Sequence, residues 1–545
     1  MSILLPIHSA DTPLLSDQRH WRVAVLLLLI LATLVAVVDV VHLPLDDHEV
    51  FVAESAQEMH DRGDWIVPYF NGQPRLNKPP LNYWLAAAAA WLTGDLAHIQ
   101  GWHARAPSVL GGLGMVLLTL YIGVRLYDRQ TAWLAGLIMA SSAGFLMYTH
   151  NARPEMLYSF FCTAGIAAFI NAWQADDQSR RQRWSAWSMW LAFALATMTK
   201  GPQLPLMLLA AMVIFLRTQR LLWARIARIL RPLSGFAIIA VLCVPWWWAL
   251  HLRLGGAGLR GSQLSGSELR PIWPPTLYYL YRPLQQILPW LVLLPGAVLA
   301  PWRKPGVTPA RLLGLLIIVP ALILCLGRLR WFYLLPALAP MCLLLAASAV
   351  SLFRASGDPA PWWRKWILPV HWGLLVAGAL WLLTQPDAGV GRVLLALVVI
   401  TGIFVPTMMA ADLRARQPLI DVVAMGLMFA GAAIALAPSP AVWGDREAPQ
   451  KMTQAVLAQV PANARLAVLK ATPNTVIYYA QRRIVRYTEM DEVVKALEQA
   501  PDRQLYLMVK VEDFPMLRAR LGVAPEVLFT STMDEGLQLV KLVRP

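Results

Sequence analysis

The chain has 545 residues, of which 57% are hydrophobic and 14% are charged, and its formal net charge is +15. Soluble globular domains carry about a quarter charged residues, so this composition excludes an ordinary soluble enzyme and indicates a membrane protein. The basic excess does not indicate a nucleic-acid partner. Most basic residues lie in short loops between apolar blocks, as they do in the cytoplasmic loops of membrane proteins.

The apolar blocks predict a polytopic α-helical membrane protein with about thirteen transmembrane helices, since each helix needs roughly 20 apolar residues. The first block, Val23–Val38, is uncharged and no small-residue cleavage site follows it, so we interpret it as a retained helix. The expected spans are approximately 22–42, 106–125, 132–149, 157–175, 185–199, 203–217, 233–250, 284–300, 312–327, 333–352, 367–384, 392–410 and 419–437. The basic loops fall on one common side, the cytoplasm, which places the N-terminus inside and the C-terminus outside.

A polar run, Asp46–Glu49, lies just outside the first expected span and reads Asp-Asp-His-Glu. The helical spacing of Val52, Ala56 and Met59 after it predicts an amphipathic helix lying on the membrane. If this helix begins near Asp46, its first acidic residues also suit the positive end of the helix dipole. Capping alone does not require four titratable residues in succession. The run is therefore a candidate catalytic segment.

Basic residues near the expected outer ends of spans are candidate substrate contacts. In the proline-rich loop that follows the acidic run, Arg75 and Lys78 either face lipid headgroups or bind a lipid-linked phosphate. Arg153 and Glu155 lie at the mouth of two expected spans, where a structural ion pair and a substrate contact are both open interpretations. Lys200 lies between two apolar blocks without a nearby acidic residue, and charge in such a place is usually functional.

The composition changes sharply after residue 437, which predicts two domains. Residues 1–437 form a transmembrane domain with a catalytic outer loop at 43–105, and residues 438–545 form a soluble α/β domain outside the membrane. Strands are expected at Arg465–Lys470, Ile484–Tyr487, Leu505–Val511, Glu526–Thr530 and Leu537–Val543, and helices at Gln450–Val460, Asp491–Gln499 and Asp513–Leu521. This module has no glycine-rich phosphate loop, so we interpret it as a lid or an acceptor-docking module.

The first outer loop carries a series of short motifs: His48-Glu49, Ala53–Met59, Gly63–Trp65, Asn71-Gly72 and Lys78–Trp84. The series resembles the bacterial type-C glycosyltransferases related to protein O-mannosyltransferases and to lipid A aminoarabinose transferase. That family has an Asp-Glu pair after the first span, then Ala-Glu-x-Ala-x-x-Met, Gly-Asp-Trp, Asn-Gly and Lys-Pro-Pro-Leu-x-Tyr-Trp.

Three later segments, Ala152–Met156, Thr199–Pro202 and Arg328–Pro336, are similar to further motifs of the same family. All three fall at expected outer ends of spans, so we expect them to converge with the first loop. The resemblance covers residues 20–350 in motifs and the rest in layout.

The chain departs from the family pattern at three positions. His48 stands where the family has Asp, with Asp47 immediately before it. Asn77 replaces an acidic residue that often precedes the Lys-Pro pair, and Glu155 stands in place of Asp. These departures bear on the base, on any metal site and on the substrate.

The resemblance implies a glycosyltransferase that moves a sugar from a polyprenyl (undecaprenyl) phosphate to lipid A, a glycan or a protein on the periplasmic face of the bacterial inner membrane. The leaving phosphate needs fixed cations, and the acceptor hydroxyl must lose its proton to a base. Asp47 is the first choice for the base, Glu49 the second, and His48 an alternative. The expected substrate-binding residues are His48, Arg75, Lys78, Arg153, Glu155, Lys200, Arg330 and Tyr333.

No nucleotide or other cofactor is required by this chemistry, but Asp46, His48 and Glu49 are candidate ligands for a divalent metal. The competing function is a lipid-linked sugar transporter or flippase. It predicts polar residues deep within spans and a two-fold internal repeat, and the sequence has neither. A purely structural scaffold leaves the acidic run and the Lys-Pro-Pro segment unexplained.

Overall fold

The computed structural model describes residues 15, 17–255, 282–303, 308–325, 331–354, 446–470, 474–500, 504–521, 525–531 and 536–543, with a few positions between 423 and 434. Contacts divide the chain into two units. The helical unit comprises Met1–Val41, Leu76–Asn82 and Arg105–Val442, and the α/β unit comprises His42–Arg75, Tyr83–Ala104 and Trp443–Pro545. Most of the first outer loop thus groups with the C-terminal residues, whereas the sequence-based division assigned it to the transmembrane domain.

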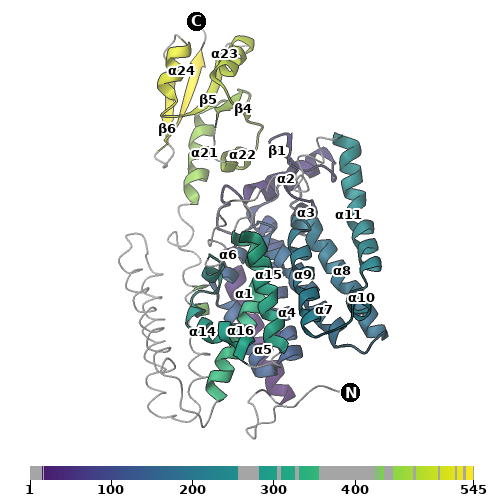
Figure 1. Cartoon of the computed structure of the whole chain (residues 1–545). Helices are drawn as coiled ribbons and strands as arrows, with labels where there is room; N and C mark the ends of the chain where they lie inside the picture. The colour runs from purple at the N-terminus through teal and green to yellow at the C-terminus, as the bar shows by residue number, and fades with distance from the viewer. Residues whose placement is uncertain are drawn as a thin grey trace, which may run out of the picture. The chain divides into compact units, whose positions relative to one another are not determined.

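The helical unit is built from apolar helices (Figure 1). They are α1 (Gln18–Val37), α4 (Gly101–Leu126), α5 (Arg129–Ala140), α6 (Ala143–Thr149), α7 (Glu155–Gln174), α8 (Arg180–Lys200), α9 (Gln203–Thr218), α10 (Trp223–Leu230), α11 (Pro232–Leu254), α14 (Leu294–Arg303), α15 (Thr308–Cys325) and α16 (Leu338–Arg354). Short 3₁₀ turns lie at Arg282–Ile287 (η3), Trp290–Leu293 (η4) and Trp331–Ala337 (η5).

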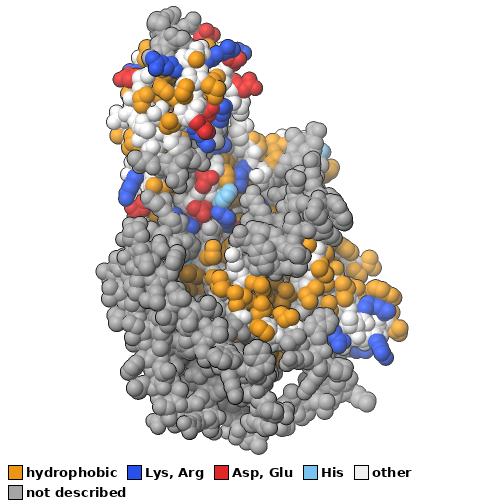
Figure 2. Space-filling model, turned by 60° about the vertical axis from the view of Figure 1, so that its left-hand side comes forward, with side chains coloured by type: hydrophobic (Ala, Val, Ile, Leu, Met, Phe, Trp, Pro, Cys, Tyr) orange, Lys and Arg blue, Asp and Glu red, His pale blue; other side chains and the backbone are white. Residues whose placement is uncertain are grey.

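Several of these helices are suited to a bilayer. In the described part of the chain, five helices are long and apolar enough to cross a membrane, and the α5–α6 pair, bent by 56°, adds a sixth if it counts as one broken span. Figure 2 shows hydrophobic side chains over the described helices of this unit, with Lys and Arg gathered at one edge. The chain is therefore a multi-pass membrane protein, as its composition predicts.

Most of the expected spans that fall on described residues agree with helices in position, with two corrections. The expected span 284–300 consists of the 3₁₀ turns η3 and η4 followed by α14, not of one continuous helix. The expected span 132–149 is interrupted at Ser141 and Ser142, where the Ser142 hydroxyl accepts a hydrogen bond from Phe145 N and so begins a new helix, α6. The expected spans 367–384 and 392–410, and much of 419–437, lie outside the described residues. The expected total of about thirteen spans therefore stays a prediction.

The close packing of α7 against α8 positions charged residues at one end of the helical unit. A Cβ atom at Gly165 in α7 would lie 2.3 Å from the Phe193 ring of α8, so only glycine permits this approach. Consecutive antiparallel helices bring the start of the first beside the end of the second. Glu155, the first residue of α7, therefore lies next to Lys200, the last residue of α8.

The C-terminal part of the α/β unit forms a five-stranded sheet with strand order β4-β3-β5-β7-β6. Its strands are β3 (Leu466–Leu469), β4 (Val485–Tyr487), β5 (Gln504–Lys510), β6 (Glu526–Thr530) and β7 (Leu537–Val543). β3 pairs in parallel with β4 and β5, whereas β7 is antiparallel to β5 and β6. Helix α21 (Glu447–Gln459) precedes the sheet, and helices α22 (Asn474–Ala480), α23 (Met490–Gln499) and α24 (Phe514–Leu521) connect consecutive strands from β3 to β6. The expected strands and helices are all present, and α22 is an addition that the sequence did not predict.

The loop part of the same unit contains α2 (Val50–Arg62), the short hairpin β1–β2 (Tyr69–Phe70 and Gln73–Pro74) and α3 (Leu81–Thr93). α2 begins at Val50 rather than near Asp46, because Asp46–Glu49 forms a separate turn. The expected apolar face of α2 is buried, and the helix contacts β1 and α22. The prediction that this face lies on the membrane is therefore wrong.

Candidate functional site

A charged cluster in the helical unit, buried at Glu155 and Lys200, joins residues from four sequence motifs. Lys200 Nζ lies 3.0 Å from Glu155 Oε1, and the two side chains are only 1% and 4% exposed. The ammonium group of Lys200 also lies 3.8 Å from the centroid of the Tyr333 ring. Lys78 Nζ lies 5.9 Å from the same centroid. The expected convergence of the Lys78 loop with the α7, α8 and η5 segments is thus seen within this unit.

Hydrogen bonds of neighbouring side chains hold the cluster in place. The Tyr158 hydroxyl donates to Gly201 O at 3.0 Å and accepts from Leu204 N at 3.2 Å, which ties α7 to the turn after α8. Asn82 Nδ2 donates to Ala152 O at 3.1 Å, which ties the Lys78 loop to the residues before α7. These bonds connect α7, the turn after α8 and the Lys78 loop around Glu155.

The cluster has an excess of positive charge. Glu155 interacts electrostatically with Lys200, Lys78 and Arg153, so one carboxylate faces three cations. A buried ion pair is costly to desolvate, and such an arrangement is typical of sites that bind an anion. Among the described residues, the second carboxylate oxygen of Glu155 and Oδ1 of Asn82 have no hydrogen-bond partner. Both atoms can accept hydrogen bonds from hydroxyl or amino groups of a substrate.

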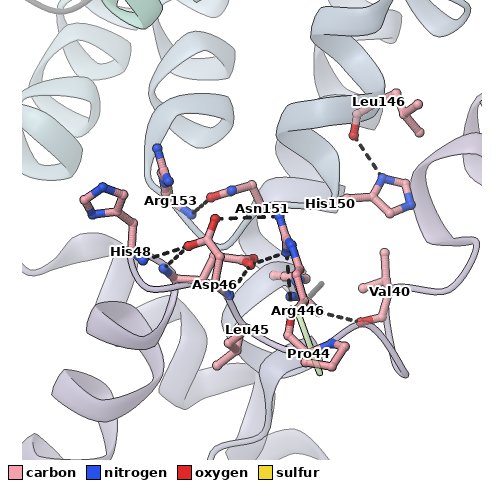
Figure 3. A network of polar contacts seen from close by, with 12 residues as sticks. Val40, Pro44, Leu45, Asp46, His48, Leu146, His150, Asn151, Arg153 and Arg446 are labelled. Atoms are coloured by element: carbon pink, nitrogen blue, oxygen red, sulfur yellow. Dashed lines mark hydrogen bonds and ion pairs between the residues drawn. The ribbon is translucent and has the colours of Figure 1, made fainter. Parts of the chain in front are cut away.

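The acidic run Asp46–Glu49 forms a turn in the α/β unit, closed by its own side chains. Asp46 Oδ1 accepts from His48 N and Glu49 N, both at 2.7 Å, and Glu49 Oε2 accepts from Asp46 N at 3.0 Å. Arg446, just before α21, lies with Nη1 2.6 Å from Glu49 Oε2 and Nη2 3.6 Å from Asp46 Oδ2. Figure 3 shows Arg446 reaching Asp46 beside His48.

Asp47 binds the start of α22. Its carboxylate accepts hydrogen bonds from Asn474 N, from Asn474 Nδ2 at 2.7 Å and from Thr475 N at 3.3 Å. Arg486 donates to Asn474 Oδ1 at 2.8 Å. Burial lowers the pKa of Arg486, and the negative charge of Asp47 opposes this effect. The Asp47 carboxylate therefore caps the N-terminus of α22, and three hydrogen bonds occupy both of its oxygens.

Of the four residues in the turn, His48 alone is exposed, while Asp46 and Asp47 are half-buried and Glu49 is fully buried. The two carboxylates that were expected to be catalytic therefore already have partners: Glu49 pairs with Arg446, and Asp47 accepts hydrogen bonds from Asn474 and Thr475. It leaves the imidazole of His48 at the surface of the α/β unit. His48 occupies the position of the family's Asp.

The structure does not support the expected metal site. Within the part of the chain that the structure describes, no three His, Cys, Asp or Glu side chains gather to hold a metal ion. The reason is visible at the expected ligands, because Asp46 and Glu49 are paired with Arg446. Two carboxylates already neutralised by a guanidinium are poor ligands for a divalent cation.

The remaining expected site residues differ in their surroundings. Arg75 belongs to the α/β unit, where its guanidinium carbon lies 3.5 Å from the centroid of the Phe51 ring. Arg153 belongs to the helical unit, where its backbone N–H donates to Asn151 Oδ1 at 3.0 Å. Arg330 lies outside the described residues. Arg446 was not predicted, because its partners lie nearly 400 residues earlier and no local pattern around it indicates an ion pair.

Comparisons with known proteins agree with the resemblance. The family model described as dolichyl-phosphate-mannose-protein mannosyltransferase matches residues 21–254. An undecaprenyl phosphate-alpha-4-amino-4-deoxy-L-arabinose arabinosyl transferase of Aeromonas salmonicida (strain A449) is 28% identical over 351 residues, which cover 60% of each chain. A protein of the same description from Yersinia pestis is 28% identical over 327 residues, covering 55% of this chain and 54% of the relative. This chain therefore spans less than two thirds of the length of these relatives.

Solved structures show the fold. The crystal structure of ArnT from Cupriavidus metallidurans in the apo state superimposes with a TM-score of 0.76 at 19% identity, over 96% of this chain and 99% of that chain. The same protein bound to undecaprenyl phosphate gives a TM-score of 0.73 at 20% identity, over 97% and 100%. The fold is that of ArnT, and the predicted resemblance to type-C glycosyltransferases is confirmed.

Proposed function

We propose that this chain, which resembles the type-C glycosyltransferases in sequence and has the ArnT fold, transfers a sugar from a polyprenyl (undecaprenyl) phosphate to an envelope acceptor. The acceptor is lipid A, a glycan or a protein. The observation that carries this proposal is the cluster of the half-buried Lys78 with the buried Lys200, Tyr333 and Glu155, with its excess of positive charge. The description of the ArnT structure with bound undecaprenyl phosphate supports the same class of donor.

In the proposed reaction, the bond between the anomeric carbon and the phosphate oxygen breaks, and the phosphate leaves with the electron pair. Lys78 and Lys200 stabilise the charge that develops on it. The aromatic face of Tyr333 keeps the Lys200 ammonium in position. Glu155 offsets part of the cationic charge and accepts hydrogen bonds from the sugar through Oε2.

The acceptor oxygen attacks the anomeric carbon and transfers its proton to a base. We propose His48 for this role, in preference to Asp47 and Glu49, because those carboxylates already accept hydrogen bonds or pair with Arg446. A neutral imidazole accepts a proton near neutral pH. His48 also stands at the position where the similar family has its Asp.

The proposal includes a topology: about thirteen spans in the bacterial inner membrane, with the first outer loop and residues 438–545 on the periplasmic side. The arginine-rich loops between the helices support this orientation. Single cysteines at Asn77 and Arg181 test it in intact cells. A membrane-impermeant reagent should label position 77 and not position 181, and labelling at 181 would reverse the orientation.

The test of the function is transfer by the purified chain in nanodiscs, with undecaprenyl-phosphate sugars and an envelope extract as acceptor. Mass spectrometry should detect the released undecaprenyl phosphate and a glycosylated product. Lys78→Ala should reduce product formation about a hundredfold or more, since one stabilising group of this kind contributes roughly 3 kcal/mol. Lys451→Ala changes an exposed lysine in α21 and is the matched control.

The competing transporter or flippase makes a different prediction for the same preparation. It would move the lipid-linked sugar between the leaflets of vesicles while the sugar stayed on its carrier. Carrier movement without any release of undecaprenyl phosphate would refute the transferase proposal.

A further inference from the structure

Arg446 lies at the N-cap position of α21, in the α/β unit. Its side chain is only 10% exposed. Nη1 lies 2.6 Å from Glu49 Oε2 and 3.5 Å from Pro44 O, and Nη2 lies 3.6 Å from Asp46 Oδ2 (Figure 3). One guanidinium thus contacts both ends of the turn that presents His48.

The contact of Arg446 with Glu49 and Asp46 balances the negative charge of the turn. Glu49 is 0% exposed, and a buried carboxylate without a cation is strongly destabilising. Each carboxylate that Arg446 contacts also fixes the backbone. Asp46 holds the N–H groups of His48 and Glu49, and Glu49 holds the N–H of Asp46. Arg446 therefore restrains the main chain on both sides of the His48 side chain.

Neighbouring residues of the turn are fastened to the same C-terminal segment. Leu45 N donates to the Tyr479 hydroxyl at 2.9 Å, and Asp47 accepts from Asn474 and Thr475. These contacts anchor the turn beside α22, whereas Arg446 acts on its two acidic side chains. The alternative is that Arg446 only neutralises the charge of Glu49. In that case, replacing both residues by neutral side chains of similar size would leave transfer unchanged.

We infer that Arg446 is a positioning residue for the transfer reaction, which holds the Asp46–Glu49 turn so that His48 meets the acceptor hydroxyl. The inference rests on the proposed function and on His48 as its base. It gives Arg446 an indirect part in catalysis, through the turn, and so differs from the expected role of the C-terminal domain as a lid. The donor-phosphate cluster in the helical unit is built from other residues, so loss of Arg446 should leave donor binding intact.

The test compares Arg446→Met, Arg446→Lys and the double variant Arg446→Met/Glu49→Gln with the wild-type chain, all in nanodiscs. The single Met variant leaves Glu49 buried without its cation, so its thermal midpoint should fall. The double variant removes that charge and should recover the midpoint. Asp46 still lacks its guanidinium there, so kcat should remain at least tenfold below wild type with the donor KM unchanged. Arg446→Lys keeps the positive charge but not the planar guanidinium that contacts both carboxylates, so its kcat should lie between those of Arg446→Met and the wild-type chain.

Arg518→Met changes an exposed arginine of α24 in the same unit and should leave kcat unaltered. Wild-type kcat in the folded double variant would overturn the inference, because Arg446 would then only balance charge. An increase in donor KM matching the loss of kcat would also overturn it, since the effect would lie in donor binding. If the wild-type chain itself transfers no sugar, the proposed function fails instead. Binding of undecaprenyl phosphate to each variant is measured separately.

Discussion

Replacing Glu54 by Gln should remove a pH dependence from the stability of the α/β unit. Glu54 lies in α2 and is half-buried. Burial raises the pKa of this carboxyl group from 4.5 to about 8, and the negative charges of Glu58 and Asp61 add to the effect. At neutral pH Glu54 is therefore protonated in the folded protein and ionised in the unfolded chain.

The sign follows from proton uptake. Between pH 4.5 and about 8, Glu54 holds one proton more in the folded state than in the unfolded state. Its contribution to the stability of the α/β unit is therefore fully present below pH 4.5 and is lost as the pH rises to about 8. At about 1.4 kcal/mol per pH unit, the full effect is at most roughly 5 kcal/mol. Gln cannot ionise, so Glu54→Gln should match the wild type near pH 4.5 and exceed it increasingly up to pH 8.5.

Hydrogen exchange of the α2 amides, measured by mass spectrometry on the full chain in detergent, reports this local stability. Exchange rates are corrected for the intrinsic effect of pH. Glu512→Gln changes an exposed carboxylate of the same unit and is the control. Equal pH dependence of α2 protection in wild type and Glu54→Gln would refute the reasoning, because Glu54 would then be ionised in the folded protein.

Three further predictions concern the turn, the buried pair and the hairpin. His48→Gln should lower kcat about a hundredfold. Asp47→Asn should instead lower the free energy of unfolding by about 1 kcal/mol, because it weakens a helix cap. A larger loss of kcat in Asp47→Asn than in His48→Gln would return the role of base to Asp47. Lys200→Met should lower the thermal midpoint, because it removes the buried ammonium that lies 3.0 Å from the Glu155 carboxylate. Adding Glu155→Gln should restore the midpoint, and an unchanged midpoint in the single variant would contradict the buried ion pair. Gly72→Ala should destabilise the chain by about 1 kcal/mol or more, since Gly72 has φ +76° and its Cβ would lie 2.0 Å from the Arg483 side chain; a thermal melt equal to wild type would show that this side chain moves aside.

Local patterns predicted the elements of the fold well. The apolar blocks of α7 and α8 and the apolar runs of β5 and β7 each carry their signal within one segment, so their positions could be predicted directly. The first residue of α2 could not be predicted in this way. Asp46 accepts hydrogen bonds from backbone groups of its own turn, so the turn stays separate from the helix. A run of acidic residues before a helix has the same appearance whether it lies inside the first turn or before it.

The site was predicted in part, for a related reason. Lys78, Glu155, Lys200 and Tyr333 lie in recognisable motifs, and their helices bring them together at one end of the helical unit. The partners of the acidic turn lie in segments without a motif, at Arg446 and Asn474. An ion pair between segments that are distant in the sequence produces no recognisable pattern in either segment. The sequence therefore identified the turn and not what its carboxylates bind.

The separation of Glu49 from Arg446 also sets an order of events during synthesis. These two residues are 397 positions apart, and at about 5–20 residues per second the ribosome needs roughly 20–80 s to pass from one to the other. Throughout that interval the Asp46–Glu49 turn lacks the cation that balances its buried carboxylate. The turn can therefore acquire its final contacts only after α22 has been translated. A chain released by the ribosome before Arg446 contains every charged residue of the helical cluster and yet cannot complete the turn that carries His48.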